Sequence, residues 1–402
     1  MALRAEPRAI ASGMELTRLA LENFRSYAAA ELHPDPGLTV VAGPNGIGKT
    51  NLLEAIHATI VGRSHRAGVE ADLVRHEAPF ARVRLDLAGG TGAGGASVEL
   101  IVPGAQPPAG IRKRLTINGV PRRSAALSDL ARVVLFRPEE MLLLVGSPSE
   151  RRRFLDGIVG QRDRKAARDL VEVARVVTQR NALLRAIRAE EASIDSLAFW
   201  DEQLAQLGSR VMRARLDVLR ELNLRIGPLH DAVAPEADET ASVRLTYLDG
   251  LKEAWAERGD PGDRMPTDDE LAVAYRDRIA SVRPKEAWNG VSLVGPQRDD
   301  LRAELADRDV ASHASRGQQR TIILAMKLAE TELLGDDGPR PIVLLDDVFS
   351  ELDPDRAARL SDLIAGRGQV IVTTADPGTL EAARRRSAAV WRIRDGALER
   401  EA

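Results

Sequence analysis

The stretch GPNGIGKTN at residues 43–51 constrains the fold more than any other part of the chain. It has the spacing of a P-loop, in which backbone N–H groups surround phosphate oxygens. Glycines allow the close backbone approach that a Cβ atom would obstruct. Lys49 would place its charge on the β and γ phosphates, and the Thr50 hydroxyl would bind Mg²⁺. The stretch therefore predicts a site for a nucleoside triphosphate.

The residues on either side of this loop favour the same interpretation. LTVVAG before the loop is typical of a short buried strand. The segment after it carries apolar residues at helical spacing, namely Leu52, Leu53, Ile56 and Ile60. A strand, a glycine-rich turn and a helix would place the phosphates at a helix N-terminus.

The composition is that of a cytoplasmic globular protein. The 402 residues suffice for two or three domains, and 44% of them are hydrophobic. Cysteine is absent, which suits a reducing compartment and excludes disulfides and cysteine zinc sites. No apolar run is long enough to cross a membrane. Residues 1–13 have no structural pattern and are predicted to be a flexible N-terminal arm.

Charge is segregated along the chain, whose net charge is −3. Residues 151–225 are net basic and residues 231–270 are net acidic. Two short basic clusters, RKR at 112–114 and RRR at 151–153, either contact phosphate or form solvated faces. Any DNA contact must come from such local surfaces.

Hydrophobic periodicity divides the chain into three parts. Residues 14–135 alternate short strand-like runs with glycine-rich turns, and residues 149–225 switch to a helical pattern. One apolar stripe there is made of Leu197, Trp200, Leu204, Leu207, Val211, Ala214 and Val218. We expect this stripe to pack inside a helical hairpin. The last part returns to an α/β rhythm.

The predicted fold is therefore an α/β P-loop ATPase head with a mixed sheet, interrupted by a mainly helical lobe. The domain borders follow the change of pattern. The arm covers 1–13, the N-terminal ATPase part 14–148, the helical lobe 149–285 and the C-terminal ATPase part 286–402.

The segment PIVLLDDVFSELD supplies the acidic strand that a P-loop needs beside it. Four apolar residues precede Asp346, which would hold Mg²⁺. Asp347 would polarise the attacking water. A general base beside a metal-binding carboxylate is an arrangement for hydrolysis.

A second anion-binding helix start is predicted at SRGQQR, where Ser315, Gly317 and Gln318 precede an apolar helix face. One chain has one P-loop, so this second group makes sense if it serves ATP held by another copy. The sequence thus predicts a homodimer with two ATP molecules between the subunits.

The order of these motifs resembles the ABC-type ATPase heads of the SMC group and, within that group, the RecF family. The similar blocks cover nearly everything from residue 14 onward. They are LENFRSY (21–27), GPNGIGKTNLLEAI (43–56), GRSHR (62–66), FRPEEM (136–141), GSPSERRRFLD (146–156), GPQRDDL (295–301), SRGQQR (315–320), LLDDVFSELD (344–353) and QVIVTTAD (369–376).

The resemblance implies a role for each matching residue. ATP would be bound by Gly43, Pro44, Asn45, Gly46, Ile47, Gly48, Lys49, Thr50 and Asn51. Thr50 and Asp346 would hold Mg²⁺, and Asp347 and Lys49 would be catalytic. Ser315, Gly317 and Gln318 would act on the ATP of the other subunit. Glu351 and Asp353 would line the dimer interface, and Arg25 and Arg63 are candidates for phosphate contact.

Two positions depart from the expected pattern. Gln297 stands where the RecF family usually has histidine. Thr373 and Thr374 end a strand without the histidine with which transporter ATPases sense the γ-phosphate. A hydroxyl, that of Thr373, would substitute, and turnover would be slow.

The implied function is that of a weak, DNA-stimulated ATPase that works as a switch. ATP would close a dimer around DNA at the single-strand/double-strand junctions of gaps. With RecR and RecO, it would help load RecA, and so support gap repair, replication restart and SOS induction. Partners would be double-stranded, single-stranded and gapped DNA, and no membrane.

Two alternatives share the same ATPase head. An SMC-like chromosome tether needs a long coiled-coil arm, but about 140 residues separate Asp156 from Gly295. Even if wholly helical, they would reach at most about 100 Å as a hairpin. The ATPase subunit of an ABC transporter would need a docking groove for transmembrane partners, and none is visible in the sequence.

Overall fold

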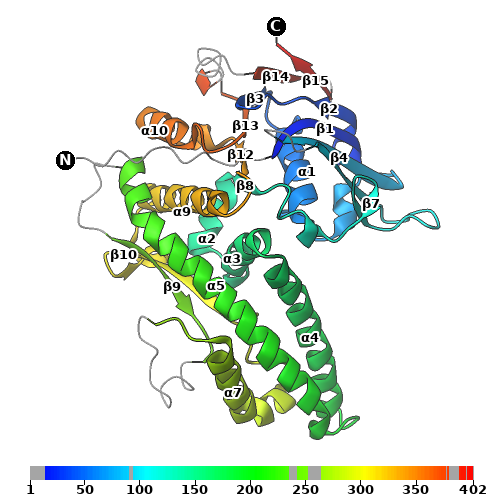
Figure 1. Ribbon diagram of the computed structural model, residues 1–402, viewed down its shortest axis with the longest axis vertical. Coiled ribbons are helices and arrows are strands. Elements are labelled where there is room, and N and C mark those ends of the chain that lie inside the picture. Colours follow the sequence, from blue (N-terminus) through cyan, green and yellow to red (C-terminus); the bar gives the residue numbers. More distant parts are fainter. Residues whose placement is uncertain are drawn as a thin grey trace. The chain divides into compact units, whose positions relative to one another are not determined.

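The structure is a computed structural model that describes residues 14–89, 94–234, 242–251, 264–376, 378–379, 389–394 and 396–401. The predicted N-terminal arm, 1–13, lies outside the described residues. The chain forms two compact units (Figure 1). Unit 1 comprises Met1–Glu140 and Lys327–Ala402, and unit 2 comprises Met141–Met326. The domain borders proposed from the sequence, after residues 148 and 285, stay a prediction.

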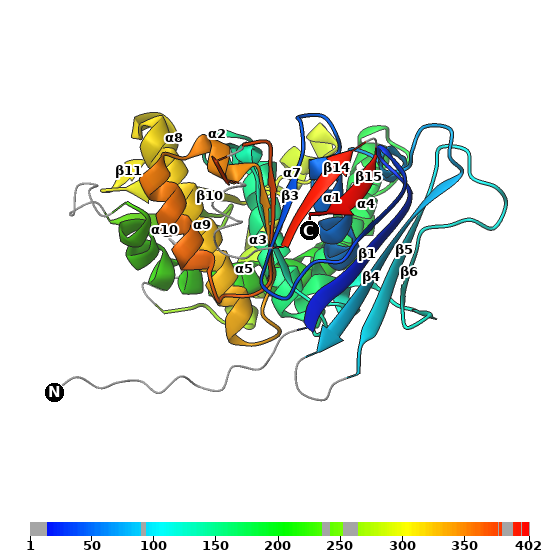
Figure 2. The ribbon, with the colours of Figure 1, turned by 90° about the horizontal axis from the view of Figure 1, so that it is seen from above.

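The first sheet of unit 1 is antiparallel, with strand order β2-β1-β4-β5-β6-β7. Four of its strands, β1, β4, β5 and β6, are labelled in Figure 2. Its strands are β1 (Met14–Phe24), β2 (Tyr27–Leu32), β4 (Phe80–Gly89), β5 (Ala96–Pro103), β6 (Arg114–Ile117) and β7 (Val120–Pro121). Apolar and charged residues alternate along β4, so Val83 and Leu85 face the core while Arg82 and Arg84 face outward. One face of this sheet is therefore apolar and the other is charged.

The second sheet of unit 1 is mixed, with strand order β15-β14-β3-β13-β12-β8. Its strands are β3 (Leu38–Ala42), β8 (Val133–Phe136), β12 (Ile342–Asp346), β13 (Val370–Thr374), β14 (Ala389–Arg394) and β15 (Ala397–Arg400). β12 and β13 are buried along their whole length, as their continuous apolar sequences predicted. β13 lies between β3 and β12, so the acidic strand is one strand away from the P-loop strand.

Helix α1 (Lys49–Val61) packs between the two sheets of unit 1. Its apolar residues Leu52, Leu53 and Ile56 are buried in one core with side chains from both sheets. The spacing that predicted an amphipathic helix therefore corresponds to a helix covered on two sides. Helix α10 (Pro354–Ile364) completes the elements around the mixed sheet.

Unit 2 is mainly helical, as the sequence predicted. Its helices are α2 (Leu142–Val145), α3 (Pro148–Arg162), α4 (Arg164–Arg188), α5 (Ala198–Val233), α7 (Asp268–Asn289) and α8 (Val310–His313). The long helices α4, α5 and α7 run side by side in Figure 1 and share one core. Leu204, Leu207 and Val211 of the predicted apolar stripe are buried in that core.

Unit 2 also contains a three-stranded antiparallel sheet that the sequence analysis missed. Its order is β11-β10-β9, from β9 (Val243–Leu248), β10 (Asp300–Leu305) and β11 (Arg308–Asp309). The strands come from two distant parts of the chain, and half of the residues of β10 are charged. Helix α9 (Arg316–Asp336) begins shortly after this sheet, and the border between the units falls within it.

Five short 3₁₀ turns complete the described elements: η1 (Glu70–Leu73), η2 (Ser124–Ala126), η3 (Pro138–Met141), η4 (Ile194–Leu197) and η5 (Val348–Glu351). Within the described ranges, no helix is long and apolar enough to cross a membrane.

Candidate nucleotide-binding site

The P-loop connects the end of β3 to the start of α1, and two of its glycines have left-handed backbones. φ is +80° at Gly46 and +117° at Gly48. A Cβ atom on Gly48 would lie 2.8 Å from the Ser26 hydroxyl and 2.9 Å from that of Tyr27. The Tyr27 hydroxyl also donates a hydrogen bond to the Gly48 carbonyl, at 3.1 Å. Gly48 is thus required both for its backbone conformation and for space.

Lys49 is the first residue of α1, and its side chain turns back into the loop. Its Nζ donates to the carbonyls of Gly43 (2.9 Å) and Pro44 (3.1 Å) and to Oδ1 of Asn45 (3.3 Å). Burial lowers the pKa of this ammonium group, while the charges of Asp347 and Asp346 act in the opposite direction. Among the described residues, this buried cation has only neutral hydrogen-bond acceptors, and phosphate oxygens would satisfy it better.

The two aspartates follow β12 and meet the end of β13. Asp346 is 7% exposed, and its Oδ1 accepts a hydrogen bond from the Thr373 hydroxyl at 2.7 Å. The N–H of Asp347 donates to the Thr373 carbonyl at 3.1 Å. The predicted γ-phosphate sensor, Thr373, is therefore bonded to the predicted magnesium ligand, and its sensing role stays a prediction.

Asp347 combines two features that structural residues rarely share. Its φ is +52°, in the left-handed region that non-glycine residues seldom adopt. Its Oδ1 is buried without a hydrogen-bond partner among the described residues. A strained carboxylate with an unsatisfied oxygen fits a group that acts on a water molecule or a metal.

The two candidate phosphate-binding arginines lie differently from each other. Arg25 is bound to the buried carboxylate of Glu54 through two hydrogen bonds of 2.9 and 2.8 Å. Arg63 is exposed. Burial would raise the pKa of Glu54, but hydrogen bonds from Arg25 and Ser64 outweigh it and keep that pKa below its ordinary value. Phosphate contact by Arg25 or Arg63 stays a prediction.

Sequence reasoning missed two residues of this network, Glu54 and Arg66. Arg66 donates to Oδ1 of Asn51 at 2.7 Å and to Glu54 at 2.9 Å. Glu54 thus ties the Arg25 segment, helix α1 and the 62–66 loop together directly beside the P-loop. Both residues stand inside the blocks GPNGIGKTNLLEAI and GRSHR, which is the signal that could have found them.

In unit 2, the predicted signature residues form the start of α9. The Ser315 hydroxyl accepts a hydrogen bond from the N–H of Gln318, and the Gln318 side chain accepts one from the N–H of Ser315. This reciprocal pair is a capping box. Both side chains are exposed, and Gly317 between them is half-buried. The arrangement leaves the first turn of a long helix open to an anion.

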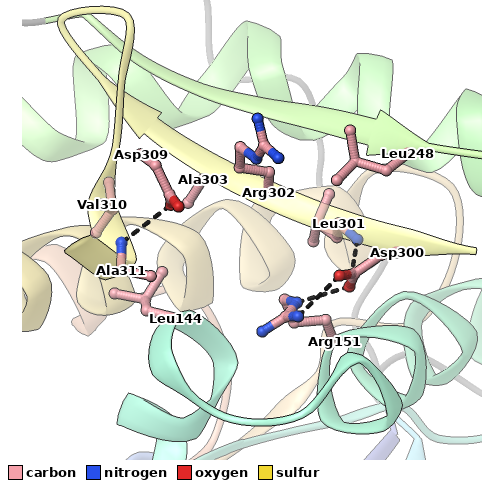
Figure 3. Close-up of a pocket in the computed structure, with 10 residues that line it drawn as sticks. All are labelled: Leu144, Arg151, Leu248, Asp300, Leu301, Arg302, Ala303, Asp309, Val310 and Ala311. Carbon is pink, nitrogen blue, oxygen red and sulfur yellow. Dashed lines mark hydrogen bonds and ion pairs between the residues drawn. The ribbon is translucent and has the colours of Figure 1, made fainter.

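The RRR cluster at 151–153 is bonded within unit 2 (Figure 3). Arg151 forms two hydrogen bonds with Asp300, at 2.7 and 2.8 Å. Arg152 donates to the Asp299 carbonyl at 2.7 Å, and Arg153 pairs with Glu150. Arg151 and Asp300 face each other beside a cavity of about 160 Å³. The sequence left two interpretations open for this cluster, a solvated face or a phosphate contact. Arg151 fits neither, because its guanidinium group is bonded to Asp300.

Gln297 is also placed by the fold of unit 2. Its Nε2 donates to the Val294 carbonyl at 3.0 Å, and its Oε1 is buried without a partner in the described part of the chain. A Cβ atom on Gly295, whose φ is +131°, would lie 2.4 Å from that oxygen. The side chain is therefore held against its own turn.

A P-loop between a strand and a helix, an acidic strand ending in two aspartates and a separate helix start with a serine signature define an ABC-type ATPase head of the SMC kind. Comparison with known proteins leads to the same class. Residues 15–397 match the family described as RecF/RecN/SMC N terminal domain. The chain belongs to this family and, within it, to the RecF proteins.

The relatives show how far the similarity extends. The DNA replication and repair protein RecF of Roseiflexus castenholzii is 34% identical over 409 residues, which cover 96% of this chain and 99% of that protein. The RecF of Frankia alni is 38% identical over 368 residues, covering 90% and 93%.

Solved structures give the same result. The recombination mediator protein RecF-ATP in the RecFOR pathway has a TM-score of 0.84 and 25% identity, with 99% of this chain and 100% of that chain covered. An SMC head bound to the C-winged helix domain of ScpA has a TM-score of 0.51 and 17% identity, covering 96% and 97%. The SMC head shows similarity of fold alone.

Proposed function

We propose that the chain is an ATP-dependent DNA-binding recombination mediator in which ATP closes a homodimer on DNA and slow hydrolysis reopens it. The observation that carries the proposal is the unsatisfied, strained carboxylate of Asp347 beside Asp346. A RecF relative covers 96% of the chain, and a similar solved structure is that of a RecF-ATP complex.

The residues around the P-loop fit a triphosphate. The N–H groups of residues 43–51 would surround the phosphates, and Lys49 would exchange its carbonyl acceptors for phosphate oxygens. Among the described residues, no group of three or more His, Cys, Asp or Glu could hold a metal ion by itself. Mg²⁺ would instead be bound by Thr50, by Asp346 and by the triphosphate, where it would neutralise developing charge.

The remaining predicted residues have roles in the chemistry or in closure. Asp347 would orient the attacking water and accept its proton. Ser315, Gly317 and Gln318 of a second copy would complete the site, since their capping box presents a helix start with exposed side chains. ATP held between two subunits stabilises the dimer by its higher affinity for the closed state.

DNA and protein partners rest on the resemblance to RecF. The chain would bind gapped DNA at the junction of single and double strands. It would act with RecR and RecO in loading RecA, in gap repair, replication restart and SOS induction. Glu351 and Asp353, which follow the acidic strand, would line the dimer interface beside the ATP of the second copy.

The test is fluorescence anisotropy of a labelled gapped duplex titrated with the Asp347→Asn variant, in ATP and in ADP, at several salt concentrations. We expect binding at least about tenfold tighter in ATP, because loss of the base traps the closed dimer and a general base contributes about 10²–10⁴-fold to turnover. Equal binding in ATP and ADP would overturn the nucleotide-gated clamp. Normal ATP turnover by this variant would remove Asp347 from its role.

A further inference from the structure

The RKR cluster at 112–114 differs from the RRR cluster in one respect. Arg112 and Arg114 are exposed, and neither guanidinium group has an ion pair or side-chain hydrogen bond with any described residue. The same holds for Arg122 and Arg123, which follow β7. Lys113 is the exception, because its ammonium group bonds the Glu70 carboxylate and the Gly62 carbonyl.

The pairing of the strands places these residues together at one edge of the antiparallel sheet. β7 is the last strand of that sheet and pairs only with β6 in the described structure. The ladder continues by one hydrogen bond from the Arg122 N–H to the Leu115 carbonyl, at 2.9 Å. This register puts Arg123 opposite Arg114. Like charges opposite each other destabilise a sheet, so another requirement must favour them.

Arg123 and Arg114 belong to a row of residues that lie opposite one another across neighbouring strands, and this row continues toward the middle of the sheet. Arg114 is opposite Ile101 on β5, and Ile101 is opposite Arg82 on β4. Strands lie about 4.8 Å apart, so this row is about 10 Å long between Arg82 and Arg114. The edge of the sheet and the outer face next to it are thus lined by cations.

Acidic partners are present only on the inner part of this outer face. Arg82 pairs with Glu22 at 2.7 Å and with Glu99 at 3.5 Å. Arg18 pairs with Glu31 and Asp86. Toward β6 and β7 such acids are lacking among the described residues, so no acid on this face neutralises the positive charge of Arg112, Arg114 and Arg123.

A groove accompanies these charges. Its lining combines an apolar floor with a cationic rim, and it consists of Phe80, Arg82, Ile101, Ile111, Arg112 and Arg114, together with Gly110 and Lys113. The Arg82 guanidinium lies over the Phe80 ring, 5.4 Å from its centroid. An elongated anion with sugar or base surface between its charges suits such a lining.

We propose that this edge, made of Arg112, Arg114 and Arg123 with the adjoining groove, binds the phosphate backbone of DNA. The inference rests on the proposed DNA-binding function and assigns part of it to a surface. Arginine suits the task because its planar guanidinium group contacts phosphate through two hydrogen bonds. The RRR cluster is not assigned this role, because Arg151 and Arg152 are bonded within unit 2 and Arg153 is paired with Glu150.

Charged residues on an edge strand can also serve only to prevent aggregation. Charge reversal separates the two explanations. In the variant R114E/R123E the edge stays charged, so protection against aggregation is kept, while attraction to phosphate is lost. Two exposed arginines of unit 2, Arg175 and Arg220, have no described partner and give a control variant, R175E/R220E, with the same change of net charge.

The experiment measures anisotropy of the labelled gapped duplex with full-length wild type, R114E/R123E and the control, in ATP, from 50 to 300 mM salt. Each phosphate contact contributes about 0.9 to the slope of log affinity against log salt. We expect R114E/R123E to lower that slope by about 1.8 and to bind roughly 50-fold more weakly at 0.1 M salt. The control should change the affinity by about threefold or less, since distant charges are screened.

The neutral variant R114Q/R123Q and thermal unfolding curves guard against misfolding. An unchanged slope in a folded R114E/R123E protein would overturn the assignment. So would an equal loss in the control, which would mean that only net charge matters. Loss of solubility in the neutral variant R114Q/R123Q, with unchanged DNA affinity in R114E/R123E, would overturn the assignment and leave protection of the edge as the explanation. If the wild type itself bound DNA equally in ATP and in ADP, the proposed function would fail instead.

Discussion

Two buried charged clusters in this protein are built in different ways. Lys49 is 6% exposed, and the described part of the chain gives its ammonium group only neutral acceptors, while a carboxylate oxygen of Asp347 has no described partner. Around Arg180, in unit 2, each guanidinium nitrogen donates a hydrogen bond: to Asp201 at 2.8 Å, to Ser292 at 2.9 Å and to Glu286 at 2.6 Å.

The difference separates a ligand site from a structural site. Burying a charge is unfavourable unless other groups satisfy it. The Arg180 cluster is satisfied by the chain alone, so its charges fix the packing of α4, α5 and α7. In the Lys49 cluster, the ammonium group is hydrogen-bonded to neutral groups and an oxygen of Asp347 has no partner among the described residues, as a site for phosphate and metal requires.

The largest expected effect tests the structural cluster. Arg180→Met should destabilise the protein by about 3–5 kcal/mol, because Glu286 and Asp201 would be left buried without their partner. Urea unfolding measures this loss. Arg175→Met, on the exposed face of the same helix, is the matched control and should change stability by about 0.5 kcal/mol or less. A loss under about 1 kcal/mol for Arg180→Met would show that the cluster does not stabilise the fold.

The second prediction tests the ligand cluster. Lys49→Ala should weaken ATP binding by about 100-fold, which is about 2.7 kcal/mol, because a charged contact to phosphate is lost. Isothermal titration calorimetry measures the affinity. Stability without ATP should change by about 1 kcal/mol or less, since no buried acid loses its partner. If this variant lost as much stability as Arg180→Met, the contrast between the clusters would be wrong.

The third prediction uses pH and concerns unit 1. Burial, with Arg137 nearby, lowers the pKa of His65 to about 4. The unfolded histidine therefore takes up a proton near pH 6.5, while the folded one stays neutral until about pH 4. Its stabilising contribution is complete above pH 6.5 and is lost as pH falls through this window.

The loss of unfolding free energy caused by His65 should reach about 2 kcal/mol between pH 7 and pH 5. Urea unfolding of wild type and of His65→Gln at both values measures it. The variant should lose less stability than the wild type over the same interval. An equal loss in both proteins would exclude His65 as its cause.

The smallest effect has the opposite sign and concerns unit 2. Burial raises the pKa of Asp299 to about 6, although hydrogen bonding from Tyr247 and the charge of Arg215 oppose this rise. The unfolded carboxyl group loses its proton near pH 3.8, while the folded one keeps it until about pH 6. The contribution of Asp299 to the free energy of unfolding is therefore complete below pH 3.8 and is lost as pH rises through 6. When the pH is lowered from 7 to 5, Asp299 should therefore increase the free energy of unfolding by about 1 kcal/mol.

Asp299→Asn should abolish this gain, again measured by urea unfolding at the two pH values. His65→Gln and Asp299→Asn should thus change the pH dependence in opposite directions. If both variants shifted it in the same direction, at least one of the two assignments would be wrong.

The sequence predicted elements better where local spacing decides them. The strand before the P-loop and the helix after it are β3 and α1, and the continuous apolar runs are the buried strands β12 and β13. The three-stranded sheet of unit 2 was missed because β9 and β10 pair across about fifty residues of chain. No short pattern in β10, whose sequence is DLRAEL, separates a strand from a loop or helix.

The candidate site divides in the same way. The P-loop, both aspartates and the signature serine were named from the sequence, because their spacing along the chain is fixed by the turn or helix start that they form. Glu54 and Arg66 were not named, because their function depends on which side chains meet in space. Arg25 was expected at phosphate, and the structure gives it a carboxylate partner, Glu54.

What the sequence by itself determined is therefore the family, the fold class and the local shape of each motif. These follow from short-range spacing and from the periodicity of apolar residues. Only the tertiary structure decided which charged groups are satisfied. RRR at 151–153 and RKR at 112–114 are alike as sequences, but Arg151 is bonded to Asp300, nearly 150 residues away, while Arg114, on the strand next to the sheet edge, has no side-chain partner among the described residues. The partner of a charged side chain is set by long-range packing, which no local pattern contains.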